Sequence, residues 1–288
     1  MSAVRLTHPD RLLWPADGLT KRDLFDYFGD VAPVMLPHVR DRPVSLQRFR
    51  AEVSEGGFFQ KELPRGAPDW LARAEVPKRG GSVTMLLAND RRTLQWLGQQ
   101  GCVTPHVFLA RADRLDRPDR LVIDLDPSGE DFDAVRRAAL ACGDALRARG
   151  LEPFAMVTGS RGVHVAVALR RTRPAADVLA WARDFATGLA DAGVAGEDLL
   201  TTAFRKEQRG GRIYVDVARN GPAQTVVAPY APRPRPHAPV ATPLRWEELE
   251  DPALRPDAWT LTSVRDRLHA LGADPWEGLR ATARALPR

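Results

Sequence analysis

Between residues 121 and 218 the sequence alternates short apolar strands with amphipathic helices, and this order restricts the fold more than any other feature. Strands are predicted, from their β-branched and apolar residues, over 121–126, 154–158, 163–169 and 212–218. A helix is predicted over 132–146, where apolar residues recur at helical spacing until Gly150. A second helix is predicted from Pro174 to Gly193. This β-α-β-β-α-β order predicts an α+β fold with ferredoxin-like, RNA-recognition-like topology.

The first third of the chain shows one clear element, a helix that opens at Thr20. Thr20 and Asp23 stand at capping-box spacing, with Asp in place of the usual Glu or Gln, and apolar residues follow at helical intervals. We expect an N-terminal α/β subdomain, residues 1–115, packed on a second part, residues 116–288. Together the two parts are expected to form one functional domain.

Composition excludes some classes of protein but does not select a function. Of the 288 residues, 44% are hydrophobic, and the formal net charge of +5 favours a polyanionic partner. Cys102 and Cys142 show neither a CxxC motif nor a histidine at ligand spacing, so no zinc ribbon or disulfide framework is predicted. No apolar stretch is long enough to span a bilayer, and the N-terminus lacks a signal-peptide core. A cytoplasmic protein without membrane association is predicted.

Three aspartates are the main candidates for chemistry. Asp124 and Asp126 alternate along one predicted strand, so both side chains point to the same face. In the ferredoxin-like arrangement the first strand lies between the third and the fourth, which puts Asp216 on a neighbouring strand. Converging carboxylates need cations, and hard oxygen ligands suit two Mg²⁺ or Mn²⁺ ions that activate a hydroxyl and stabilise a leaving pyrophosphate. A D-x-D pair alone is often only a turn cap or a surface pair, so the prediction depends on the third carboxylate.

A glycine-flanked turn lies beside these aspartates in the predicted sheet. Residues 159–162 read GSRG, so Ser160 and Arg161 offer a hydroxyl and a guanidinium next to backbone N–H groups, which suits a triphosphate. His164 follows on the strand expected to flank Asp124. An ordinary hairpin turn explains the same letters, and only the position beside the carboxylates favours phosphate binding.

Two further segments allow more than one interpretation. Residues 56–61 read GGFFQK, in which Phe58 or Phe59 could stack on an unpaired base while the other belongs to a core. Arg205, Lys206 and Arg209 precede the last predicted strand as either a solvated loop or a phosphate grip.

Six ordered motifs resemble one known family. They read LTHPDRLLWP, LTKRDLFDYF, GGFFQKELP, LVIDLDP, TGSRGVHV and RIYVDVARNG with VVAPYAPR. Together they are similar to the polymerase domain of bacterial DNA ligase D, a member of the archaeo-eukaryotic primase superfamily that acts in non-homologous end joining. The resemblance runs from residue 5 to about 265 and implies a catalytic palm of RNA-recognition topology in residues 116–288.

The resemblance also implies roles for individual residues. Asp124, Asp126 and Asp216 correspond to metal ligands. The incoming nucleotide would be bound by His106, Thr158, Ser160, Arg161, His164 and Arg209. DNA would be bound by Arg11, Lys21, Phe58, Phe59 and Lys61, with Arg11 and Lys21 on a recessed 5′ phosphate. Arg161 stands where lysine is usual in the family, and His8 where asparagine is frequent.

The implied activity is nucleotidyl transfer by a repair polymerase. Ribo- or deoxyribonucleotides from NTP or dNTP substrates would be added to DNA 3′ ends at gaps and breaks, with two Mn²⁺ or Mg²⁺ ions. Ku and a DNA ligase are the implied partners, in a bacterial cytoplasm and at the nucleoid. The chain would be either a separate polymerase or a domain of a larger ligase. The alternatives are a DNA-end or RNA-binding module without catalysis and a metal-dependent nuclease. Exposed acids on the central strands argue against the first, and a triphosphate cradle against the second.

Overall fold

The computed structural model describes residues 4–194 and 196–287, which divide into two compact units. Unit 1 comprises Met1–Leu115, Thr225–Ala241 and Trp259–Gly272. Unit 2 comprises Asp116–Gln224, Thr242–Ala258 and Ala273–Arg288. The C-terminal part of the chain therefore contributes segments to both units. Both units combine sheet with helix, so the predicted α+β class is confirmed.

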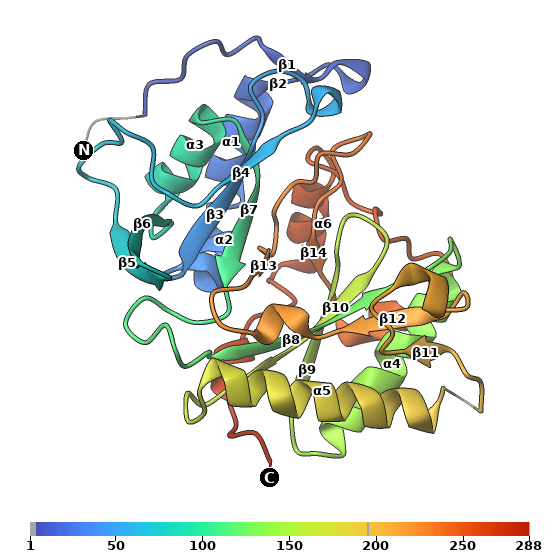
Figure 1. The fold of residues 1–288 in the computed structure, drawn as a ribbon. Helices are drawn as coiled ribbons and strands as arrows, with labels where there is room; N and C mark the ends of the chain where they lie inside the picture. Colours follow the sequence, from blue (N-terminus) through green and yellow to red (C-terminus); the bar gives the residue numbers. More distant parts are fainter. Residues whose placement is uncertain (1–3, 195, 288) are drawn as a thin grey trace. The chain divides into compact units, whose positions relative to one another are not determined.

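Unit 2 is built on a six-stranded sheet with the order β11-β12-β8-β10-β9-β14 (Figure 1). Its strands are β8 (Arg120–Asp126), β9 (Pro153–Val157), β10 (Val163–Ala168), β11 (Leu200–Thr201), β12 (Ile213–Asp216) and β14 (Thr242–Pro243). The four predicted strands are all present, and β8, β9, β10 and β12 pair antiparallel in the order β12-β8-β10-β9. The two-residue strands β11 and β14 extend the sheet at its edges and were not predicted.

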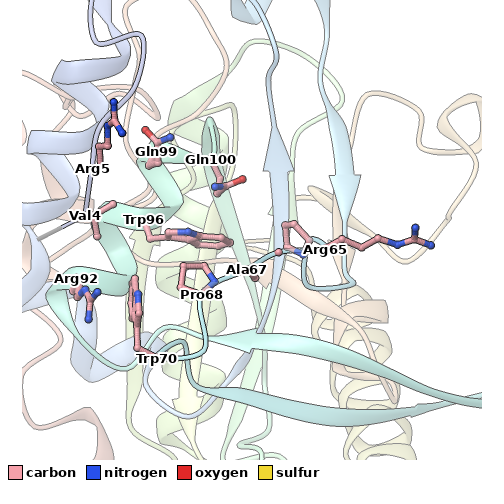
Figure 2. Close-up of a pocket in the computed structure, with 12 residues that line it drawn as sticks. Val4, Arg5, Arg65, Ala67, Pro68, Trp70, Arg92, Trp96, Gln99 and Gln100 are labelled. Carbon is pink, nitrogen blue, oxygen red and sulfur yellow. The ribbon is translucent and has the colours of Figure 1, made fainter. Parts of the chain in front are cut away.

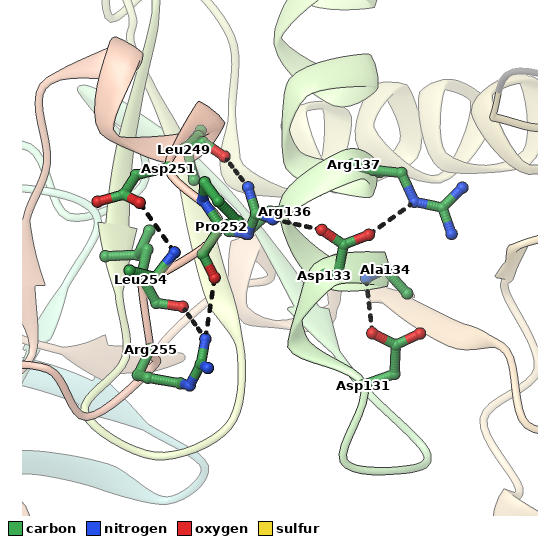
Figure 3. A network of polar contacts seen from close by, with 11 residues as sticks. Asp131, Asp133, Ala134, Arg136, Arg137, Leu249, Asp251, Pro252, Leu254 and Arg255 are labelled. Carbon is green, nitrogen blue, oxygen red and sulfur yellow. Dashed lines mark hydrogen bonds and ion pairs between the residues drawn. The ribbon is translucent and has the colours of Figure 1, made fainter.

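Helices α4 (Phe132–Arg147) and α5 (Ala175–Ala192) lie on one side of this sheet (Figure 1). The α4 helix begins where the Asp131 carboxylate accepts a hydrogen bond from the Ala134 N–H, which satisfies an otherwise unpaired donor (Figure 3). The α5 helix follows Pro174 and ends at Gly193, which has a φ of 68°. Both predicted helices are therefore confirmed.

Alternation along β8 separates the core from the candidate site. Leu121, Ile123 and Leu125 are fully buried, whereas Asp124 and Asp126 are only partly buried. Successive side chains on a strand point to opposite faces, so the apolar set faces the core and the acids face the other side. The Asp131-capped helix and the apolar face of β8 thus fix which face of the sheet carries the carboxylates.

Unit 1 contains a second six-stranded sheet and the N-terminal helices. Its main path is β13-β7-β3-β6-β5, and β4 pairs with β3 beside that path. The strands are β3 (Pro43–Arg48), β4 (Phe58–Gln60), β5 (Arg73–Lys78), β6 (Gly81–Leu87), β7 (Cys102–Phe108) and β13 (Thr225–Val227), with β1 (Leu12–Trp14) and β2 (Leu19–Thr20) as a separate pair. The helices are α1 (Lys21–Asp30), α2 (Ala32–Val39), α3 (Arg91–Gln99) and α6 (Val264–Leu271).

The predicted capping box at the start of α1 is confirmed. The Thr20 hydroxyl accepts from the Asp23 N–H, and the Asp23 carboxylate accepts from the Thr20 N–H at 2.7 Å. These reciprocal bonds satisfy two backbone donors at the helix start. The helix ends at Asp30, and Val31 begins the turn into α2. Within residues 4–194 and 196–287, no helix has the length and apolar character that a membrane span requires.

Two helical glycines of unit 2 give a matched test of the packing. Alanine is favoured over glycine inside a helix by roughly 0.5–1 kcal/mol. Gly188 on α5 has open space around its Cβ position, so Gly188→Ala should raise the free energy of unfolding. A Cβ on Gly143 of α4 would lie 2.0 Å from the Trp246 ring, so Gly143→Ala should lower it. Urea unfolding of both variants measures the two signs, and an equal gain in both would contradict this packing.

Candidate active site

Three polar side chains line up across three neighbouring strands of unit 2. Asp216 on β12 is the direct partner of Asp124 on β8, and Asp124 is the direct partner of His164 on β10. Directly opposed residues of an antiparallel pair have Cβ atoms about 4.5–5.5 Å apart and share one face. The predicted neighbourhood of the two aspartates and the histidine is therefore confirmed. His164 is almost fully buried, and its Nε2 lies 3.5 Å from Asp124 Oδ2.

Asp126 stands on the same face of β8 and is engaged by two arginines. Its Oδ1 lies 3.4 Å from Arg161 Nη2, and its Oδ2 lies 3.3 Å from Arg209 Nη1. Its partner across β12 is Tyr214. The two guanidinium groups offset the negative charge of Asp126, which the sequence analysis had expected metal ions alone to do.

Arg209 is a fixed part of the site, because its side chain is buried and its donors are used. Its Nε donates to the Ala203 carbonyl at 3.2 Å and its Nη2 to the Phe204 carbonyl at 3.0 Å. Its guanidinium lies 4.3 Å from the centre of the Tyr214 ring. Arg205 and Lys206 are exposed. The segment had been interpreted either as a solvated loop or as a phosphate grip. Arg205 and Lys206 face solvent, whereas Arg209 is buried and organises the loop beside Asp126.

The pKa of Asp216 reflects both its burial and the carboxylates near it. Burial raises this pKa above its ordinary value, and the negative charges of Asp124 and Asp126 raise it further. The Ala218 N–H, which donates to Asp216 Oδ1 at 2.8 Å, partly opposes the shift. The site therefore has an excess of negative charge on which a cation would be stabilised.

The turn 159–162 is closed by Thr158 and approaches β8 closely. The Thr158 N–H donates to the Gly162 carbonyl, and the Gly162 N–H donates to the Thr158 hydroxyl at 3.2 Å. A Cβ on Gly162 would lie 2.4 Å from the Leu125 carbonyl oxygen, so only glycine fits here. The predicted hairpin between β9 and β10 is confirmed by the pairing of Val163 with Val157. Ser160 and Arg161 occupy the outer part of the turn.

The donor set of this site suits a hard divalent cation. The three carboxylates supply oxygen ligands only, and Cys142, the cysteine of this unit, is buried away from solvent. In the part of the chain that the structure describes, no three His, Cys, Asp or Glu side chains are already gathered closely enough to hold an ion. At this site the Asp126 carboxylate is directed toward Arg161 and Arg209. The residue types fit a metal, and the orientation of Asp126 is that of an ion pair.

Arg11 and Lys21, the cations predicted to bind a 5′ phosphate, lie in unit 1, and Lys21 is buried. Its Nζ donates to the Thr7 carbonyl at 2.8 Å and to the Gln99 Oε1 at 3.0 Å. Burial, together with the charges of Arg11 and Arg48, lowers the pKa of Lys21 to about 8. Among the described residues, the hydrogen-bond acceptors of this ammonium are two neutral oxygens, and the charges that act on it are those of two arginines.

The predicted aromatic residues of β4 face different surroundings. Phe59 is 61% exposed and meets the ring of His106 on β7 edge-on at 5.2 Å. Phe58 is partly buried, and the guanidinium groups of Arg48 and Arg50 lie 5.6 and 5.1 Å from its ring centre. Neither ring belongs to the hydrophobic core, so either ring is accessible for stacking on a base. Lys61 is exposed beyond the end of β4.

The structure adds residues that the sequence analysis missed. Arg48 and Arg50 frame Phe58, Tyr214 supports Arg209, and Gln99 holds Lys21. Arg48 and Arg50 could have been found from their alternation at the end of an apolar strand. Tyr214 and Gln99 carry no signal in the sequence. Arg209, the partner of Tyr214, lies outside its strand, and Lys21, the partner of Gln99, is 78 residues away.

Comparison with known families identifies this arrangement. The family model described as "LigD, primase-polymerase domain" matches residues 20–276. The chain is therefore of the polymerase class of nucleotidyltransferases, and the reaction that this class implies is a metal-dependent nucleotidyl transfer from a nucleoside triphosphate. The chain belongs to the primase-polymerase domain family of LigD.

Individual relatives agree with this assignment. The solved polymerase domain from Mycobacterium tuberculosis ligase D in complex with DNA is 36% identical, with a TM-score of 0.88 over 97% of this chain and 99% of that one. The multifunctional non-homologous end joining protein LigD of Mycolicibacterium smegmatis is 36% identical over 93% of this chain and 35% of its own length. The corresponding protein of Pseudomonas aeruginosa is 30% identical over 98% of this chain and 33% of its own length. The chain thus spans about a third of these curated relatives.

The raised pKa of Asp216 predicts a gain in stability when its charge is removed. The ionised carboxylate is less favourable in the folded protein than in the unfolded chain, so it lowers stability above its folded pKa. That cost disappears as the pH falls below the unfolded pKa. Without added divalent ions, Asp216→Asn should raise the melting temperature by a few degrees at neutral pH and by nothing near about pH 3.

Calorimetry of Asp216→Asn and of Asp184→Asn checks this prediction. Asp184 is an exposed carboxylate on α5, so its substitution should leave the melting temperature nearly unchanged. Asparagine at position 216 keeps an oxygen for the Ala218 N–H. A melting temperature that falls at neutral pH in Asp216→Asn would show that the three acids do not repel one another.

Proposed function

We propose that Asp124, Asp126 and Asp216 hold two divalent ions, Mn²⁺ or Mg²⁺, and that the protein adds ribo- or deoxyribonucleotides from NTP or dNTP to DNA 3′ ends. The observation that carries this proposal is the direct pairing of Asp216 with Asp124, with Asp126 on the same face. Bound ions would lower the pKa of the primer 3′ hydroxyl and stabilise the charge on the leaving pyrophosphate.

Arg161 and Arg209 have two successive roles in this proposal. Before nucleotide binds, both pair with Asp126 and offset its charge. A triphosphate presents more negative charge than one carboxylate, so it would draw Arg161, which is half exposed, away from Asp126. Arg209 is anchored by two backbone carbonyls and would stay in place. The exchange frees one oxygen of Asp126 as the nucleotide arrives.

The remaining nucleotide contacts come from the turn and its flanking strands. Thr158 and Gly162 hold the turn so that Ser160 can donate to a phosphate. His164 is placed by Asp124 at the floor of the same face. His106, on β7 of unit 1, is proposed as a further nucleotide contact, and its ring already meets an exposed aromatic side chain.

The sheet of unit 2 is proposed to be a ferredoxin-like, RNA-recognition-like palm. The order β12-β8-β10-β9, with antiparallel neighbours and helices after the first and third of its strands in sequence, supports that assignment. Unit 1 is proposed to carry the DNA-end contacts. Arg11 and Lys21 would bind the 5′ phosphate of a gap, and Phe58, Phe59 and Lys61 would contact the strands.

The biological setting is proposed from the relatives. Those relatives are named for non-homologous end joining, and the solved neighbour is a complex with DNA. We infer gap filling and end processing at broken DNA, with Ku and a ligase activity as partners and the bacterial nucleoid as the location. A DNA-end or RNA-binding module without catalysis is disfavoured because carboxylates, rather than aromatic residues, face outward on β8.

Removal of one carboxylate should abolish nucleotide addition. Asp124 is central in the row of paired residues, so Asp124→Asn should slow primer extension on the order of a hundredfold or more, because a ligand of the proposed ions is lost. Gel-based extension with NTP and dNTP in Mn²⁺ and in Mg²⁺ measures the loss. DNA binding should be unchanged, and Asp184→Asn should extend primers normally. Normal extension by Asp124→Asn would refute the assignment of these acids.

The Lys21 ammonium should make recognition of a 5′ phosphate depend on pH. Because its pKa is about 8, it loses its proton as the pH rises from 7 to 9, and a phosphate dianion is then bound less well. The preference for a phosphorylated over an unphosphorylated gap should therefore shrink over that range.

Fluorescence anisotropy with the two gapped duplexes measures this preference. Lys21→Met should remove both the preference and its pH dependence, because methionine keeps most of the length of the side chain without its charge. Lys78→Met, at an exposed position of β5, should retain both. A preference that survives in Lys21→Met would assign the phosphate to other residues.

A further inference from the structure

A cavity in unit 1 lies beside Gln99, the residue that accepts a hydrogen bond from Lys21. It has a volume of about 430 Å³ and is bounded by the N-terminal segment, the loop 64–70 and one side of α3 (Figure 2). This volume is within the range of pockets that hold small organic ligands, roughly 300–1,000 Å³. The cavity is therefore large enough for a base or a sugar with its phosphate.

The charged residues that line this cavity are all positive. Three arginines line it, Arg5, Arg65 and Arg92, and none of its other lining residues is acidic. Figure 2 shows Arg65 extending away from the other side chains, so it belongs to the rim, whereas Arg5 and Arg92 rise from the N-terminal segment and α3. Guanidinium groups bind phosphate oxygens through paired N–H donors. The ligand that this cavity suits is therefore an anion.

The wall of the cavity is flat and aromatic. The Arg92 guanidinium lies 3.6 Å from the centre of the Trp70 ring, and Pro68 lies beside the Trp70 and Trp96 side chains in Figure 2. A guanidinium that stacks on an indole by its face directs its five N–H donors outward in the plane of the group. An anion on Arg92 would thus have an apolar, planar surface beside it, which suits a nucleobase or a sugar.

Two glutamines join this cavity to the proposed 5′-phosphate site. Gln99 lines the cavity, and its Oε1 accepts from Lys21 Nζ at 3.0 Å. Gln100 lines it too, and its carbonyl oxygen accepts from Arg48 Nε at 2.9 Å. One residue therefore separates a cation of the phosphate site from the interior of the cavity. The cavity is therefore adjacent to the residue proposed to bind the terminal phosphate.

We propose that this cavity, defined by Arg92, Trp70, Trp96 and Gln99, binds a nucleotide unit of the 5′-phosphorylated DNA strand, next to its terminal phosphate. The proposal deepens the DNA-end contacts proposed above and rests on them. Arg92 and Arg5 bind the phosphodiester, and the Trp70, Pro68 and Trp96 surface supports the sugar or base. Recognition of the strand then extends from its end to at least one internal linkage.

The test compares Arg92→Gln with Arg91→Gln in the full chain. Arg91 precedes Arg92 on α3, is exposed, and lines a different cavity, so its substitution removes the same charge from outside the site. Arg92→Gln should weaken binding of a gapped duplex roughly tenfold at low salt and reduce the salt slope by about one. Arg91→Gln should stay within about twofold. Thermal melts of both variants establish that each is folded.

Neutral linkages in the DNA locate the contact. Methylphosphonates are placed one at a time at the first four linkages of the downstream strand. In the unmodified protein one position should weaken binding roughly tenfold, and the same position should cost nothing in Arg92→Gln. Equal behaviour of Arg92→Gln and Arg91→Gln, or a methylphosphonate effect that persists in Arg92→Gln, would overturn the proposal.

Two further outcomes separate this site from its neighbours. If Arg92→Gln abolishes binding of free dAMP but leaves binding of gapped DNA unchanged, the cavity takes free nucleotides and the strand assignment is wrong. If the intact protein shows no preference for a 5′ phosphate, the role of Lys21 is lost. The Arg92→Gln effect, measured on unphosphorylated gaps, still decides the cavity.

Discussion

The antiparallel pairing of β12, β8 and β10 is the constraint on which the acidic site depends. It brings Asp216, Asp124 and His164 into one row, although their positions in the sequence are separated by tens of residues. Side chains alternate along β8, so the same register that buries Leu125 against the core presents Asp124 and Asp126 on the opposite face. A shift of one residue in the register would bury the acids and expose the leucines.

Charge balance is the second property of this face. Burial raises the pKa of Asp216 most, and the negative charges of Asp124 and Asp126 raise it further. Two arginines offset part of the charge at Asp126, and one of them, Arg209, is buried and anchored by backbone carbonyls. The protein thus keeps an unfavourable cluster of acids in a folded structure, which is expected where the cluster serves a bound cation.

Unit 1 shows a different arrangement around Lys21, where the charges that act on the ammonium are those of two arginines. Lys21 is buried among a backbone carbonyl, an amide oxygen and two arginines, so its ammonium is satisfied by hydrogen bonds but not by charge. Gln99 holds that ammonium from one side and lines the Arg92 cavity with the other. The proposed DNA contacts of this unit therefore depend on positive charge, as the proposed metal site of unit 2 depends on negative charge.

The sequence by itself determined the main strands and helices of unit 2 and the acidic residues that share one face of its sheet. The alternation around Asp124 and the periodicity of 132–146 are local signals, and local signals suffice for strands and helices. The edge strands β11 and β14 were missed because two residues carry no periodicity.

Only the tertiary structure decided which charges meet. The pairing of Asp126 with Arg209, the support of Arg209 by Tyr214 and the burial of Lys21 behind Gln99 depend on side chains that no motif connects. The reason is physical: a strand or a helix follows from neighbours in sequence, whereas desolvation and Coulomb interactions depend on distances that exist only after the chain has folded.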